Sequence, residues 1–206
     1  MSLVAEGLTF AYPGGVPLLE GFSLAVEPGE CVALAAPSGR GKTTLCRLLA
    51  GYLQPMAGGV VVDGTPLGAE HGLLRAVCPV QLIWQHPEQA FDPRMRMVRA
   101  LAEAGDAEGA RGRMLRERFG VRDAWLSRLP HELSGGELMR CCLVRPLLAR
   151  PRYLICDEST AMLDAVTQAE LWHAIVAIAR EERLGIVLVS HSSPLVARIA
   201  TRRVEL

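Results

Sequence analysis

The sequence lacks an excess of charge of either sign, and it lacks any long hydrophobic run. Its 22 Lys and Arg residues equal its 22 Asp and Glu residues in number, so the formal net charge at pH 7 is zero. Nucleic-acid-binding domains usually carry a basic excess, and its absence argues against nucleic acid as a partner. No stretch reaches the ~18 consecutive apolar residues that a membrane-spanning helix needs. A role at a membrane is therefore expected to depend on a partner protein.

The cysteines, the histidines and the N-terminus lack the patterns of several other classes. None of the six cysteines forms a CxxC pair, and several lie in apolar runs such as ECVALAA, where a free cysteine behaves as a small core residue. The histidines show no metal-ligand spacing, so no zinc site is predicted. The first residues do not combine a charged region with a long apolar run, as a signal peptide would. We expect a protein of the reducing cytoplasm.

Arginines gather in one stretch of the chain despite the neutral total. They are Arg111, Arg113, Arg116, Arg118 and Arg122, and Glu117 interrupts them. Such a run can bind phosphate groups, but it is more often the solvated face of a helix. The second interpretation is favoured here.

The order of apolar segments predicts an α/β fold in one domain, residues 1–206. Strand patterns such as LTFAY and CVALAA precede a helical pattern, TTLCRLLAGYL, and a hairpin pattern, GGVVVDGTPLG. From about 95 to 150 the composition turns to Arg, Glu, Leu and Ala, which predicts an inserted helical lobe. Strands and helices then alternate again, so residues 1–90 and 151–206 are expected to form a core with a largely parallel sheet. Such sheets bind ligands at the carboxyl ends of their strands.

The segment PSGRGKTT joins the strand CVALAA to the following helix, which is the context of a phosphate-binding P-loop. The backbone N–H groups expected to wrap a β-phosphate belong to Ser38, Gly39, Arg40, Gly41 and Lys42. The helix N-terminus adds favourable partial charge. The alternative is a glycine-rich turn that opens an ordinary helix, and the Gly-Lys-Thr-Thr register disfavours it.

The remaining P-loop residues have separate expected roles. Lys42 would reach the β- and γ-phosphates, and the Thr43 hydroxyl, followed by Thr44, would hold Mg²⁺. The usual pattern begins with glycine, and here that position is Ala36. A methyl group is tolerated there only if φ stays negative.

Two adjacent carboxylates, Asp157 and Glu158, end the apolar strand YLICDE. Burying charge is costly without a cation or partners, so we predict that Asp157 holds Mg²⁺ and that Glu158 is the general base for a water. A solvated strand end is the alternative. His191 ends another strand and Gln85 follows one, which predicts the histidine beside a γ-phosphate and the glutamine amide on Mg²⁺ or the attacking water. A structural role is the alternative for His191.

Two further segments extend the nucleotide site. Tyr12, in LTFAYPGG, is a candidate platform for adenine stacking, with core packing as the alternative and Phe10 as a weaker candidate. HELSGGELMR reads as a second helix start, because Ser134 can cap a helix and two glycines follow it. A single chain has no obvious need for two phosphate-binding helix starts.

With APSGRGKTT, Gln85, LSGGE, LICDE, STAMLD and SH in this order, the chain resembles the ATP-binding-cassette (ABC) ATPases along essentially its whole length. The resemblance implies a P-loop NTPase (RecA-like) core with an antiparallel β subdomain and an inserted α-helical lobe. It also implies ATP and Mg²⁺ as cofactors.

LSGGE matches the signature motif of that family. In such proteins two cassettes pack head to tail, and each signature closes over ATP held by the P-loop of the other. The resemblance therefore implies that Ser134, Gly135, Gly136 and Glu137 contact nucleotide bound to a second ABC subunit, identical or different. It also implies permease partners that hold the chain on the inner face of the membrane. FDPRMRM and PHELSGGE are similar to the cassettes of peptide and nickel importers.

Three positions depart from the family pattern. Glu137 stands where the family usually has Gln, Ser192 where it has Asp, and Val144-Arg145-Pro146-Leu147 where it has Ala-Arg-Ala-Leu. None removes a catalytic group, so we expect effects on rate or on partner choice.

Three functions compete at this point. The leading one is the ATPase subunit of a transporter, an importer of the peptide, nickel or metal-chelate type. The second is a cassette ATPase of a soluble assembly, similar to phosphonate-cleaving complexes. The third is a nucleotide-gated module that hardly hydrolyses ATP, and the presence of Lys42, Asp157, Glu158 and His191 argues against it.

Overall fold

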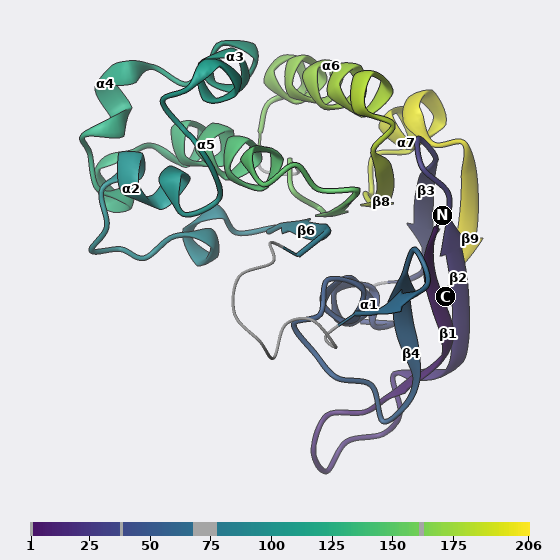
Figure 1. Cartoon of the computed structure of the whole chain (residues 1–206). Helices are drawn as coiled ribbons and strands as arrows, with labels where there is room; N and C mark the ends of the chain where they lie inside the picture. Colours follow the sequence, from purple (N-terminus) through teal and green to yellow (C-terminus); the bar gives the residue numbers. More distant parts are fainter. Residues whose placement is uncertain (1, 38, 68–77, 161–162) are drawn as a thin grey trace.

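The computed structural model describes residues 2–37, 39–67, 78–160 and 163–206. Two sheets and the helices around them form the structure (Figure 1), and this arrangement confirms the predicted α/β class. The P-loop residue Ser38 and the pair Ala161 and Met162 of STAMLD lie outside the described residues.

The larger sheet is parallel and has five strands, in the order β6-β7-β8-β3-β9, and the predicted site residues follow or end several of these strands. Its strands are β3 (Cys31–Ala35), β6 (Val80–Ile83), β7 (Tyr153–Asp157), β8 (Gly185–Val189) and β9 (Arg202–Glu205). The helices α1 (Lys42–Leu49), α6 (Ala165–Glu182) and α7 (Ser193–Ile199) connect them. The strands β7 and β8 are buried along their whole length, which explains their uninterrupted apolar sequences.

Alternate residues of this sheet face two different cores. Tyr153 and Ile155 of β7 belong to a core shared with α1 and the other sheet. Leu154 and Cys156 belong to a core shared with the helical lobe and α6. This is the two-residue period of a strand covered on both faces.

An antiparallel sheet packs on the α1 side, with the order β2-β1-β4-β5. Its strands are β1 (Leu3–Phe10), β2 (Leu19–Val26), β4 (Ala57–Val62) and β5 (Thr65–Pro66). The expected hairpin is the β4–β5 pair, where Val62 lies opposite Thr65.

Between β6 and β7 the regular elements of the described residues are all helical, and they lie together to one side of the sheet (Figure 1). They are the 3₁₀ turns η2 (Pro87–Ala90) and η3 (Pro130–Glu132) and the helices α2 (Met97–Ala102), α3 (Ala110–Arg118), α4 (Asp123–Leu126) and α5 (Gly135–Leu148). We call the region from α2 to α5 the helical lobe. Its apolar side chains, such as Leu143, share one core with Leu154 of β7 and Trp172 of α6.

The prediction of a solvated arginine face is wrong for two of the five arginines. Arg116 is buried, donates to the carbonyl of Ala107 and lies 3.2 Å from Oδ1 of Asp123. Arg111 donates to both carboxylate oxygens of Glu182, at 2.6 and 2.9 Å. The reason is packing: Arg111 joins α3 to the end of α6 through Glu182, whereas Arg116 is enclosed within the lobe between Ala107 and Asp123. The other three, Arg113, Arg118 and Arg122, are exposed as expected.

Replacement of Arg116 by Ala is expected to lower the free energy of unfolding by about 1–3 kcal/mol, because the carbonyl of Ala107 loses its buried donor. Urea denaturation measures this change. Arg113→Ala is the matched control, since that side chain is exposed and a change within about 0.5 kcal/mol is expected. Equal effects of the two substitutions would contradict the structural role of Arg116.

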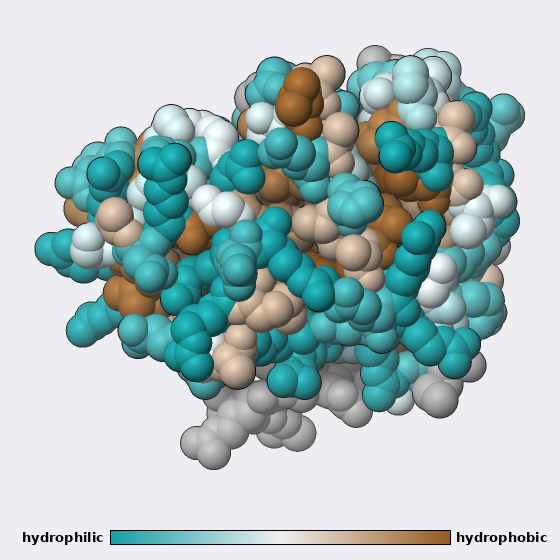
Figure 2. Space-filling model, turned by 90° about the horizontal axis from the view of Figure 1, so that it is seen from above, coloured by the Kyte–Doolittle hydropathy of each residue, from teal (hydrophilic) through white to brown (hydrophobic). Residues whose placement is uncertain are grey.

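All six cysteines are free, and five of them are buried, as the apolar runs predicted. Among the described residues no helix is both long enough and apolar enough to cross a bilayer. Seen from above, the surface is mostly hydrophilic, and its apolar residues show mainly in the hollows (Figure 2).

Candidate functional site

The P-loop connects the end of β3 to α1, and its glycines are required by backbone conformation. Gly39 and Gly41 have φ angles of +80° and +88°, a left-handed region that side chains disfavour. Gly41 is also the N-cap of α1. Ala36 is not among the four non-glycine residues of positive φ in the described chain. Its methyl group therefore fits without backbone strain.

Lys42 starts α1 and is buried, and its ammonium group lies over the loop. Its Nζ donates to the carbonyls of Ala36 at 2.8 Å and of Pro37 at 3.1 Å. Thr43 is exposed in the same turn, and Arg40 is exposed before it. A fixed cation and the N-terminus of a helix thus meet at the carboxyl end of β3, which is an arrangement suited to a polyphosphate.

Asp157 ends β7 and is the buried carboxylate of the site, with 4% of its surface exposed. Its Oδ1 atom has no hydrogen-bond partner among the described residues. Burial raises the pKa of this carboxyl, and the neighbouring Thr43 side chain works against that shift. A buried oxygen without a donor, beside a threonine hydroxyl, is the donor set that a hard divalent cation requires. No group of three or more His, Cys, Asp or Glu side chains in the described chain could hold a metal alone.

Glu158 adopts a left-handed conformation that is unusual for a side-chain-bearing residue, with φ +49°. Its N–H donates to Val189 of the next strand at 3.0 Å. Its Oε2 accepts from Nε2 of Gln85 at 3.1 Å, and its Oε1 lies 2.8 Å from Nε2 of His191. Three residues predicted separately thus meet at one carboxylate. Costly backbone conformations persist mainly where function holds them.

Two small cavities meet at His191 and Ser190, and one of them is lined by Glu158. One, of about 270 Å³, is lined by Glu158, Ser190 and His191 together with residues of α6. The other, of about 230 Å³, is lined by Lys42, Ser190 and His191. The P-loop lysine and the histidine therefore line the same space, and the place of His191 beside a γ-phosphate stays a prediction.

The signature segment forms a capped helix start of its own. Ser134 is the N-cap of α5, and its Oγ accepts from the N–H of Glu137 at 3.4 Å. The Glu137 carboxylate turns back to accept from the Ser134 N–H at 2.9 Å, and this bond lowers its pKa. The carboxylate of Glu137 is thus held against the backbone N–H of the N-cap residue, Ser134. A side chain at Gly135 would meet nothing within 4 Å, so this end of α5 is open.

Among the described residues, no hydrogen bond joins the signature segment to the P-loop. The two helix starts are therefore separate features of the chain.

Comparison with known proteins agrees with this geometry. The family described as ABC transporter matches residues 19–161, well over half of the chain. The chain belongs to the ABC transporter family. This confirms the resemblance and the expected P-loop NTPase core with its antiparallel subdomain.

Individual family members show how far the likeness extends. The chain is 37% identical to the methionine import ATP-binding protein MetN of Caulobacter vibrioides over 92% of its length, but it spans only 59% of that protein. It is 32% identical to the nickel import ATP-binding protein NikE of Pseudomonas putida, covering 94% of this chain and 74% of NikE. The dimeric cassette MJ0796, solved with ADP and Pi, has the same fold, with a TM-score of 0.85 at 21% identity over 99% of this chain and 94% of that chain.

Within this cassette the two aromatic candidates differ. Tyr12 is 41% exposed, packs edge-on to Phe10 at 5.0 Å and places its hydroxyl 3.4 Å from Oγ1 of Thr44. Phe10 is buried in the core. Tyr12 is therefore the aromatic ring that is open to a ligand beside α1, and its role as a platform stays a prediction.

Two polar groups of the cassette site lie in quoted motifs, Ser190 in SH and Thr160 in STAMLD, but the sequence assigned neither of them a role. Ser190 lines both small cavities, and its Oγ accepts from the Ser192 N–H at 3.1 Å. Thr160 is buried, and its Oγ1 accepts from Nε1 of Trp172 at 2.9 Å. The position of Ser190 at the end of a buried strand was the available signal. The bond to Trp172 depends on α6 packing and has no local sequence signal.

Proposed function

We propose that the chain is the ATP-hydrolysing subunit of an ABC importer. The observation that carries the proposal is the Glu158 carboxylate, held between Gln85 and His191 next to the P-loop. A carboxylate in that place can accept a proton from a water that attacks the γ-phosphate. The amide of Gln85 and the imidazole of His191 would fix its two oxygens, so that the lone pairs point in a defined direction.

ATP would bind with its β- and γ-phosphates in the P-loop, opposite the ammonium group of Lys42. Mg²⁺, when bound, would neutralise part of the phosphate charge. Thr43, Gln85 and Asp157 are the residues that fit it, because a hydroxyl, an amide oxygen and an unpartnered buried carboxylate oxygen suit a hard cation. Tyr12 would stack on the adenine.

The proposed working form is a head-to-tail dimer. The capped start of α5 is open, and it makes no contact with the P-loop of its own chain in the described residues. Ser134, Gly135 and Gly136 would therefore act on nucleotide bound by a second cassette. The dimeric form of the neighbouring cassette supports this arrangement.

Import is the proposed process because the relatives are named for import of methionine and of nickel. A peptide, nickel or metal-chelate system remains the proposed class, with the solute recognised by other subunits. A cavity of about 280 Å³ between β6 and the helical lobe, lined by Tyr52, Trp84 and Arg145, would receive a short permease helix. Pro146, one of the departures from the family pattern, lines it too. The chain would then lie on the inner face of the membrane through its permease partners.

Lys42→Ala is expected to weaken ATP binding about tenfold or more, because the phosphates lose their fixed cation. Fluorescent-nucleotide titration of the purified chain measures this. Arg40→Ala is the control on the exposed side of the loop, and a smaller loss is expected. Equal affinities of wild type and Lys42→Ala for the nucleotide would contradict the assignment of the P-loop as the phosphate-binding site.

The transport role has a separate test. Co-purification of the chain with enzymes of a soluble assembly, and with no permease, would contradict it.

A further inference from the structure

A further cavity, of about 730 Å³ and larger than the three described above, lies at the opposite end of the parallel sheet from the P-loop. Tyr153 begins β7 directly after Arg152, Arg183 shortly precedes β8, and Glu27 precedes β3. The amino ends of three neighbouring strands therefore form its floor. Nothing in the nucleotide site described above uses these residues.

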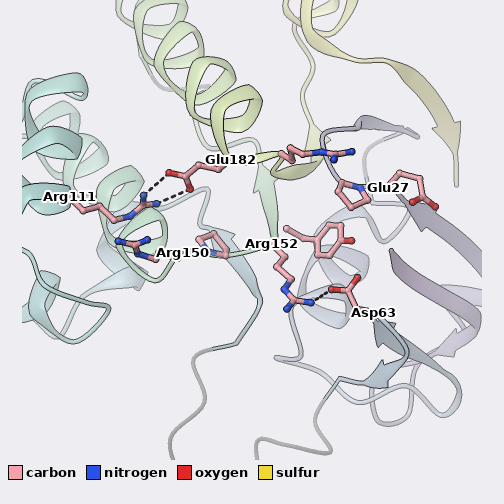
Figure 3. A pocket seen from close by; sticks show the side chains of 10 residues that line it. Glu27, Asp63, Arg111, Arg150, Arg152 and Glu182 are labelled. Carbon is pink, nitrogen blue, oxygen red and sulfur yellow. Dashed lines mark hydrogen bonds and ion pairs between the residues drawn. The ribbon is translucent and has the colours of Figure 1, made fainter. Parts of the chain in front are cut away.

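Four arginines line this cavity, and they come from three separate segments of the chain. Arg111 of α3 and Arg150 and Arg152, both just before β7, are labelled in Figure 3. The fourth is Arg183, which follows α6. Arg111 is paired with Glu182, and Arg152 is paired with Asp63. Within the described part of the chain, Arg150 and Arg183 have no carboxylate partner. The lining thus holds more positive than negative groups.

The two unpaired arginines share an unusual backbone conformation. Arg150 has φ +52° and Arg183 has φ +54°. Each follows a helix, at a position where glycine is the residue of lowest backbone cost. The chain therefore accepts a disfavoured conformation twice, from helices far apart in sequence, and both times it places a guanidinium group at the same cavity.

A buried polar residue, Tyr153, also lines the cavity. The Tyr153 hydroxyl has no geometric hydrogen-bond partner among the described residues, although the residue is 1% exposed. Burial, with the negative charges of Asp63 and Glu27, raises the pKa of Tyr153 to about 12, so the hydroxyl remains a donor at neutral pH. Pro28 and Pro151 form apolar parts of the cavity wall. The volume lies within the range of small-molecule sites.

We propose that this cavity binds a small organic anion with two or more carboxylate or phosphate groups, held by Arg150 and Arg183. Guanidinium groups bind both kinds of oxyanion through paired N–H donors. Arg111 belongs to the helical lobe, Asp63 to the turn between β4 and β5, and Arg183 to the turn before β8. The cavity thus borders the lobe, the antiparallel sheet and the core.

The test uses the whole chain with ADP in the P-loop, titrated by calorimetry at low ionic strength. The probes are tricarballylate, a tricarboxylate, and pyrophosphate, an anion with two phosphate groups. We expect a dissociation constant on the order of 1 mM or tighter for at least one probe. Binding of tricarballylate alone identifies a carboxylate ligand, and binding of pyrophosphate alone identifies a phosphate ligand.

The decisive variant is Arg150→Gly combined with Arg183→Gly. Glycine suits positive φ, so the thermal midpoint should stay the same or rise while probe affinity falls at least about tenfold. Arg99→Ala combined with Arg198→Ala removes the same charge from exposed positions outside the cavity, and it should bind as wild type does. The proposal is overturned if neither probe binds wild type, or if both double variants bind equally well. Pyrophosphate binding that only Lys42→Ala abolishes would also overturn it.

Discussion

Glu158→Gln slows ATP hydrolysis by on the order of 100-fold or more, while ATP still binds, if Glu158 is the general base. The amide has the shape of the carboxylate but cannot take a proton from water. Gln85 can still donate to its oxygen, so the geometry of the site should survive. Single-turnover hydrolysis and nucleotide titration separate the chemical step from binding.

Glu205→Gln provides the control for this experiment. Glu205 is an exposed carboxylate on β9, at the far edge of the same sheet, and its replacement should leave turnover within about twofold.

The Glu158→Gln variant should also remain dimeric in the presence of ATP, because the nucleotide that joins two cassettes is no longer consumed. Normal turnover together with a monomeric form in ATP would refute the base role.

Ser134→Arg is expected to abolish turnover while the isolated chain keeps its ATP affinity. The side chain caps α5, apart from the P-loop of its own chain, so a bulky cation there leaves the cradle intact. It would, however, block closure over nucleotide held by the partner. Ser127→Arg, at an exposed position ahead of the signature, is the matched control and should hydrolyse ATP normally.

Mixing Ser134→Arg with Lys42→Ala tests the composite site directly. Each mixed dimer holds one site with both an intact lysine and an intact signature, and a second site with both lesions. Random pairing of identical subunits makes about half the dimers mixed, so recovery could reach about a quarter of wild-type activity if the sites are independent. Loss of ATP binding by the Ser134 variant alone would place the signature in its own site, and the dimer proposal would fail.

The parts of this site that the sequence predicted are those at the carboxyl ends of strands. Lys42, Asp157 and His191 each follow or end an apolar run, and a parallel sheet brings such ends to one edge. The separation between the signature and the P-loop was expected from the resemblance and agrees with the described contacts.

Other features depend on partners distant in sequence and gave no local signal. The partial burial of Arg111 and the burial of Arg116 follow from packing of α3, and the arginine run alone looked solvated. The positive φ of Glu158 has no signature in the sequence, since glycine is the residue that usually marks such positions. The cavity with four arginines collects residues from five separate segments, with no motif that joins them.

The hydrophobic core shared by the helical lobe and the parallel sheet has a consequence for modular exchange. Leu143 of α5 and Leu154 of β7 belong to the same packed cluster, so the lobe has no separate interior that would keep it folded after excision. Recombination between two cassettes at the borders of the lobe would pack the lobe of one parent against the sheet face of the other, and the side chains of these two surfaces would not be complementary. A viable chimaera would therefore have to inherit α5 and the sheet face beneath it from the same parent.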